Sequence, residues 1–106
     1  MPLPDLAPEE RRAALAKAAE ARRTRADLKD QLKLRAVGLQ TVFDRAATED
    51  AVAKMRVTDV LAAMPAYGPV KARRLMEELG IAPTRRVRGL GPRQREALLS
   101  AFGDRS

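Results

Sequence analysis

Three groups of residues in this sequence have types and spacing suited to binding an anion, and the first surrounds a short turn. The segment Pro65-Ala66-Tyr67-Gly68 is typical of a turn between two helices, and Pro69 follows where the second helix would begin. We expect Gly68 to supply the positive φ that such a turn needs. The N–H groups of Gly68, Val70 and Lys71 would then be unpaired at a helix N-terminus, where phosphate binds well. The alternative is an ordinary helical hairpin whose turn faces water.

The second group is an arginine-rich loop at residues 82–92. It places three guanidinium groups in four positions, at Arg85, Arg86 and Arg88. Arginine suits phosphate because its planar fork can donate two hydrogen bonds. We expect Val87 and Leu90 to anchor the loop, while Gly89 and Gly91 let its backbone approach a ligand. The alternative is a loop that is merely basic and exposed.

The third group is a basic stripe on a long N-terminal helix. Its members fall at helical offsets of 0, 3, 7 and 11 and so share one face of the helix, namely Arg22, Arg25, Lys29 and Lys33. Asp27 and Asp30 lie on another side and do not neutralise the stripe. It could follow a phosphate backbone, or it could be a solvated helix face.

Several kinds of chemistry are excluded by composition. The 106 residues include no Cys and no His, which rules out thiol and imidazole catalysis, disulfides and the usual zinc sites. We therefore expect no catalytic residues, no metal and no cofactor. There is no long apolar run, so we expect a soluble cytoplasmic protein with no membrane contact and no small-molecule substrate.

Charge is distributed unevenly along the chain. The net charge is +7, and residues 37–64 are close to neutral while both flanking parts are basic. This asymmetry favours a polyanionic partner touched from two sides, although basic charge can also serve solubility alone.

The elements that would position these groups are all expected to be helical. Abundant Ala and Leu and few β-branched residues favour an all-α fold, with a long N-terminal helix followed by a compact helical domain. We expect helices at residues 8–35, 39–47, 50–55, 59–64, 69–79 and 92–102, with Thr58 as the N-cap of the fourth. Leu28 and Leu32 would dock the first helix on the domain. We divide the chain into residues 1–38, a helical extension, and residues 39–106, the domain.

The order of these elements resembles the actinobacterial integration host factor family. The resemblance covers nearly the whole chain and is carried by LAPEERRAALAKAAEARRTRADLKDQLK, VAKMRVTDVLAAMP, GPVKARRLMEELGI and RRVRGLG. It implies a helix-two-turns-helix domain, similar to one in a small-subunit ribosomal protein and in some DNA glycosylases. It also implies a nucleoid-associated protein that binds double-stranded DNA with low sequence specificity and bends it or alters its topology.

The resemblance also implies which residues contact DNA. To the basic stripe we add the residues that match the family's turn and its second contact element, namely Met64, Pro65, Ala66, Tyr67, Gly68, Pro69, Val70, Lys71, Arg74, Arg85, Arg86, Val87, Arg88, Gly89, Leu90, Gly91, Pro92, Arg93 and Gln94. The family usually has Pro-Gly-Val-Gly in the turn, so Ala66 and Tyr67 are departures from its pattern. The hydroxyl of Tyr67 would offer a replacement donor.

Other functions remain as alternatives. The same fold could bind RNA or a ribosome, or it could act as a protein-interaction module with the first helix as docking arm. Glycosylases with this domain use an N-terminal proline amine, but here Pro2 is followed by Leu3 rather than an acid, and their zinc finger and catalytic domain are missing. We expect a monomer located in the nucleoid.

Overall fold

Every regular element in the described part of the chain is helical, which confirms the expected all-α class. The computed structural model describes residues 7–103, and within them the only strand-like pairing is an isolated antiparallel bridge between Arg56 and Arg86. In chain order the elements are α1 (Pro8–Lys33), α2 (Leu39–Ala46), α3 (Asp50–Ala53), α4 (Val57–Ala62), α5 (Pro69–Glu78), the 3-10 helix η1 (Val87–Gly89) and α6 (Pro92–Ala101). Pro2 lies outside the described residues.

α1 begins where the sequence predicts and ends two residues earlier. Pro8 is its first residue, with Glu9 and Glu10 at the positive end of the helix dipole. At the other end, the N–H of Ala36 donates to the carbonyl of Gln31 at 2.9 Å. This bond closes a Schellman motif, which requires the left-handed backbone that Arg35 adopts with φ of 61°. Arg35 therefore follows the helix instead of ending it.

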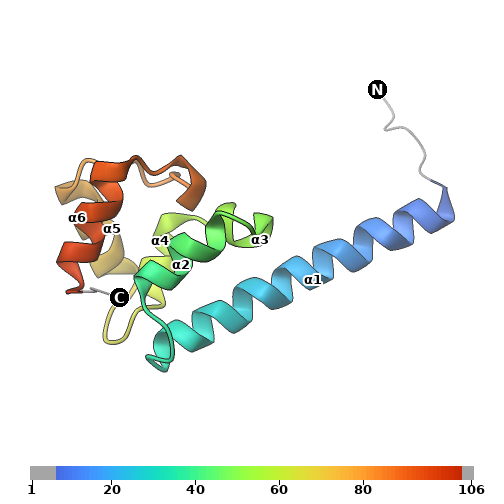
Figure 1. Ribbon diagram of the computed structural model, residues 1–106, viewed down its shortest axis with the longest axis horizontal. Helices are drawn as coiled ribbons and strands as arrows, with labels where there is room; N and C mark the ends of the chain where they lie inside the picture. Colours follow the sequence, from blue (N-terminus) through green and yellow to red (C-terminus); the bar gives the residue numbers. More distant parts are fainter. Residues whose placement is uncertain (1–6, 104–106) are drawn as a thin grey trace.

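Only the second half of α1 packs on the rest of the molecule. Leu28 and Leu32 are fully buried, whereas Leu15 is 64% exposed. Figure 1 shows the first half of α1 extending away from the other helices. The expected docking by Leu28 and Leu32 is confirmed. The division of the chain at residue 38 stays a prediction, although these two leucines complete the core of the second part.

The core lies among α2, α3, α4, α5, α6 and the end of α1, with Val87 of η1 at its edge. α2 contributes Leu39, Val42 and Phe43, which are all buried. α4 begins at Val57 with Arg56 as its N-cap, so the expectation that Thr58 caps this helix is wrong. The helix starts earlier because Arg56 pairs with the loop after α5, and that pairing fixes its extended backbone.

Local signals set the ends of α5. Pro69 is its first residue, and Gly80 follows its end with φ of 68°. The N–H of Ile81 donates to the carbonyl of Met76 at 2.8 Å, so Gly80 occupies the left-handed position of a second Schellman motif. Within the described residues, no helix combines the length and apolar character needed to cross a bilayer.

Candidate functional site

The turn between α4 and α5 uses its residues differently from the sequence-based expectation. Gly68 has φ of −148°, an ordinary extended conformation, and serves as the N-cap of α5. The left-handed residue of the turn is Ala66, with φ of 59°. The expectation that Gly68 supplies positive φ is therefore wrong. The chain reverses two residues earlier, where the hydrogen bond from the Tyr67 N–H to the Met64 carbonyl closes the turn at 3.0 Å.

The amide groups of this turn remain available for a ligand. The first helical hydrogen bond of α5 runs from the Ala72 N–H to the Gly68 carbonyl at 3.0 Å. No turn or cap hydrogen bond of the described residues uses the N–H groups of Gly68, Val70 or Lys71. The Val70 side chain beside them is 70% exposed. The N-terminus of α5 thus presents free donors and the positive end of its dipole to solvent.

Side chains brace the turn from its C-terminal side. Lys71 Nζ lies 3.4 Å from the carbonyl oxygen of Ala66 and 5.9 Å from the ring centroid of Tyr67. The Tyr67 ring packs on Phe102 of the α6 end, with centroids 4.7 Å apart and an interplanar angle of 53°. Tyr67 thus has both Phe102 and the Lys71 ammonium near its ring, and the residue is half-buried. The Lys71 ammonium stays beside the free amides.

The arginine loop is held in place by its backbone. Val57 N–H donates to the Arg85 carbonyl at 2.9 Å, and Val87 N–H donates to the Met55 carbonyl at 2.9 Å. Val87 and Leu90 are buried, as the sequence predicts. These contacts join the loop to the junction of α3 and α4.

The three guanidinium groups of the loop have different surroundings. Arg85 Nη1 donates to the Gly89 carbonyl at 2.8 Å. The Arg85 side chain packs so closely on Gly89 that a Cβ at position 89 would lie only 2.9 Å from Arg85 Cδ. Arg86 Nη1 donates to the Lys54 carbonyl. Arg88 is exposed, and its charge contributes to lowering the pKa of the Asp50 carboxyl, which is lowered chiefly by the hydrogen bond with Lys54. The loop therefore spreads its cations over several directions.

The start of α6 carries a cap and an exposed cation. Gln94 Oε1 accepts a hydrogen bond from the Gly91 N–H at 3.0 Å. Its amide therefore serves mainly to cap the helix, whereas Arg93 in the same first turn is exposed. Arg74, on α5, is exposed as well.

The basic stripe of α1 divides where the helix meets the domain. Arg25 and Lys29 line a hollow together with Arg86 of the arginine loop. Arg22 borders a groove between α1 and α3, and Lys33 is exposed at the helix end. Two of the four stripe residues thus meet the arginine loop, which the sequence could not show.

The turn and the arginine loop lie at opposite ends of α4. The loop is bonded to residues just before α4, the turn follows its end, and six residues of helix span about 9 Å. In Figure 1 the α4–α5 turn lies beside the C-terminal end of α1, away from the loop that precedes α6. The candidate residues therefore form two groups. One is the turn, and the other consists of the arginine loop together with the basic stripe of α1.

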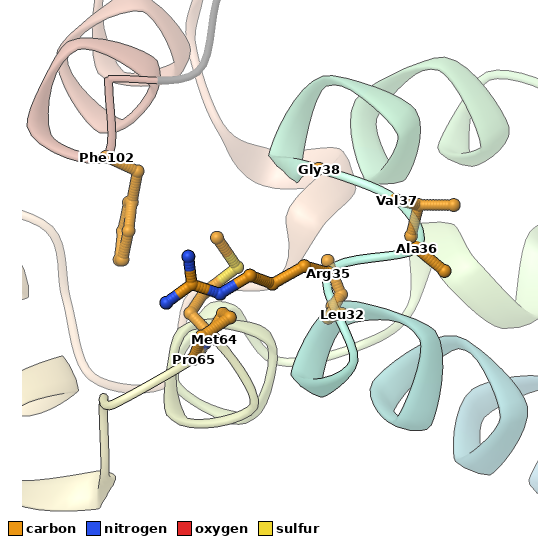
Figure 2. A pocket seen from close by; sticks show the side chains of 8 residues that line it. All are labelled: Leu32, Arg35, Ala36, Val37, Gly38, Met64, Pro65 and Phe102. Atoms are coloured by element: carbon orange, nitrogen blue, oxygen red, sulfur yellow. The ribbon is translucent and has the colours of Figure 1, made fainter.

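One cation beside the turn was missed by the sequence reasoning. Arg35 lines a pocket with Met64, Pro65 and Phe102. Figure 2 shows its guanidinium reaching across this pocket above Met64 and Pro65, toward Phe102. Its position depends on the left-handed backbone after α1, for which an arginine in the sequence gives no signal.

Comparisons with known proteins place this arrangement in context. Residues 32–102 match the family model for the S13-like H2TH domain. The chain is 55% identical over 102 residues to the integration host factor of Mycolicibacterium smegmatis, covering 96% of this chain and 97% of that protein. It is 54% identical over 103 residues to the integration host factor of Mycobacterium tuberculosis, covering 97% and 98%. A solved structure of sIHF bound to an 8-base-pair palindromic DNA is 43% identical, with a TM-score of 0.81, and the match covers 83% of this chain and 99% of that one.

Proposed function

Because the chain belongs to the integration host factor family and contains its S13-like H2TH domain, we propose that it is an architectural protein that binds duplex DNA with little sequence preference. The observation that carries this proposal is the similarity to the solved structure of sIHF bound to DNA. The match covers nearly the whole length of that sIHF chain. The unpaired amides of the turn and the exposed cations of the arginine loop give the proposal its chemistry.

The two groups of contacts would hold separate stretches of the DNA backbone. The amides of Gly68, Val70 and Lys71 would bind one phosphate, and Arg88 with Arg93 would bind others beyond the far end of α4. Holding phosphates at the two ends of α4 would favour a bent duplex.

Base reading would contribute little. Asparagine and glutamine are the side chains that pair best with adenine, and the sequence has no Asn. The oxygen of Gln94 is already engaged in its cap. These side chains would therefore read adenine weakly, and we expect affinity to be dominated by phosphate contacts and sequence specificity to be low.

The first test is a salt titration of binding to a short duplex. With about 6–8 phosphate contacts, affinity should fall by orders of magnitude between 50 and 200 mM salt, because each contact releases condensed counterions. Fluorescence anisotropy with a labelled duplex measures this. Affinity that stays constant across the titration, or a preference for structured RNA in competition, would contradict the proposal.

The second test removes single cations. Lys71→Gln and Arg88→Gln should each weaken binding for all sequences alike and reduce the salt slope by about 1. Arg95→Gln is the matched control, since Arg95 is exposed on α6 but lines a hollow that faces α2. Loss of binding in the control equal to that in Arg88→Gln would show that total charge alone matters.

We extend the proposal to the cellular and chemical setting. The protein acts as a monomer in the nucleoid and does not catalyse a reaction on DNA. Sedimentation with and without duplex checks the first point, and imaging of a tagged chain over the chromosome checks the second. An abasic-site nicking assay checks the third, with no cleavage expected.

A further inference from the structure

A basic hollow lies where α1 passes the junction of α3 and α4 and the arginine loop. Three separate segments of the chain contribute to it. Its charged lining consists of Arg25, Lys29, Lys54, Arg56, Arg86 and Asp59. The lining of this concave space of about 300 Å³ therefore has five cationic side chains and one carboxylate. A hollow of this size is at the lower end of small-ligand pockets.

The backbone forces two of these cations together. Arg56 and Arg86 are directly opposite each other in the antiparallel bridge. The flanking hydrogen bonds run from Val57 to Arg85 and from Val87 to Met55, so the two arginines form the pair without mutual hydrogen bonds. In that geometry side chains stand closest, and like charges directly opposite are destabilising. The fold thus holds a repulsive pair in a fixed position.

Very little within the described residues neutralises this charge. The two ion pairs found there join Arg45 to Glu49 and Lys54 to Asp50. Neither engages Arg25, Lys29, Arg56 or Arg86. Asp59 is the one carboxylate in the lining. Arg86 is oriented by its hydrogen bond to the Lys54 carbonyl, which leaves most of its five donors unused.

We infer that the basic hollow is a preformed site for closely spaced phosphate groups, such as the linked phosphates of an oligophosphate chain. The bridge holds the backbones of the two arginines opposite each other, so that their guanidiniums can each donate paired hydrogen bonds to adjacent phosphoryl groups, and Arg25 and Lys29 of α1 add two more cations to the lining. A bound polyanion would relieve the repulsion between Arg56 and Arg86. Such phosphates come either as a free oligophosphate or as neighbouring groups of a nucleic-acid backbone. The site shares Arg25, Lys29 and Arg86 with the candidate DNA-contacting residues, but the inference does not rest on DNA binding.

The test compares thermal unfolding of the full chain with and without inorganic triphosphate, at matched ionic strength. Triphosphate should raise the melting temperature of the unchanged protein. Arg56→Gln should melt at a higher temperature than the unchanged protein when no ligand is present, because the repulsion is gone. The same variant should bind triphosphate about tenfold more weakly, having lost a charged contact.

Two further variants complete the design. Arg95→Gln carries the same charge change outside the hollow and should match the unchanged protein in both measurements. Asp59→Asn removes the one carboxylate and should strengthen triphosphate binding. The inference is overturned if Arg56→Gln and Arg95→Gln respond alike to triphosphate, or if triphosphate stabilises the unchanged protein no more than NaCl of equal ionic strength.

A short duplex provides the second arm. If Arg56→Gln weakens duplex and triphosphate binding by similar factors, the hollow takes the phosphates of the DNA backbone. If only triphosphate binding falls, the hollow takes a free oligophosphate. Both results support the site, whereas a chain that binds triphosphate there but no duplex at all would refute the proposed function alone.

Discussion

At the scale of single residues, the left-handed backbone of Ala66 shapes the turn. An L-residue in this region is less stable by about 1–2 kcal/mol, and glycine avoids that strain but adds about 0.5–1 kcal/mol of backbone entropy loss. Ala66→Gly should therefore raise the free energy of unfolding by roughly 0.5–1 kcal/mol. Urea denaturation measures the change.

The control for this variant is Ala47→Gly. Ala47 follows α2 as its C-cap with φ of −67°, a conformation that carries no such strain. It should show no gain in stability, because only the entropic loss remains. Equal stabilisation by both substitutions would mean that the turn at Ala66 is not strained. The result bears on function because the same turn positions the free amides.

At the scale of elements, the attachment of α1 depends on two leucines near its end. Leu32 is fully buried in the core, and Leu15 on the same helix is 64% exposed. Leu32→Ala should lower the free energy of unfolding by about 3–5 kcal/mol, because it removes buried surface and leaves a cavity. Leu15→Ala, the identical chemical change, should alter it by less than about 0.5 kcal/mol.

Thermal unfolding followed by circular dichroism distinguishes these two outcomes. Similar effects of the two substitutions would contradict the packing of α1. In that case the meeting of Arg25 and Lys29 with the arginine loop would also lose its basis, since Leu28 and Leu32 hold this part of the helix on the domain.

At the scale of the whole molecule, we expect the free energy of unfolding to change with pH in the acidic range rather than near neutral pH. The sequence has no His, and the pKa of Glu49 is lowered chiefly by its hydrogen bonds with Arg45, at 2.6 and 2.8 Å. A carboxyl whose pKa is depressed by folding stabilises the protein above its unfolded pKa, about 4.3 for Glu. That contribution is lost as pH falls through the folded pKa. Protonation also increases the net positive charge and its self-repulsion.

Glu49→Gln should therefore flatten the acid limb of a plot of stability against pH, measured by urea denaturation between pH 3 and 7. Near neutral pH the loss should be small, about 0.5 kcal/mol, because the pair is partly exposed. Glu78→Gln serves as control, since Glu78 is exposed and makes no ion pair among residues 7–103. An unchanged acid limb in Glu49→Gln would show that other carboxyls dominate it.

Much of the fold could be predicted because its signals are local. Pro8 and Pro69 mark helix starts, Gly80 marks an end, and the spacing of Leu28 and Leu32 gives the buried face of α1. The candidate site could be predicted less completely. The preference of glycine for positive φ pointed to Gly68, whereas Ala66 is the left-handed residue of the turn. Nothing in the sequence marked Arg35 as the left-handed residue that follows α1.

The sequence by itself determined the helical class, the order of the elements and the presence of unpaired amides at the start of α5. Proline, glycine and the helical period act through neighbouring residues, so their effects can be read along the chain. Only the tertiary structure decided that Arg56 stands against Arg86, that α1 brings Arg25 and Lys29 to the same hollow, and that the arginine loop lies at the start of α4, away from the turn. Such neighbours are set by how helices pack around a shared core, where residues far apart in the chain come together for reasons that no local pattern records.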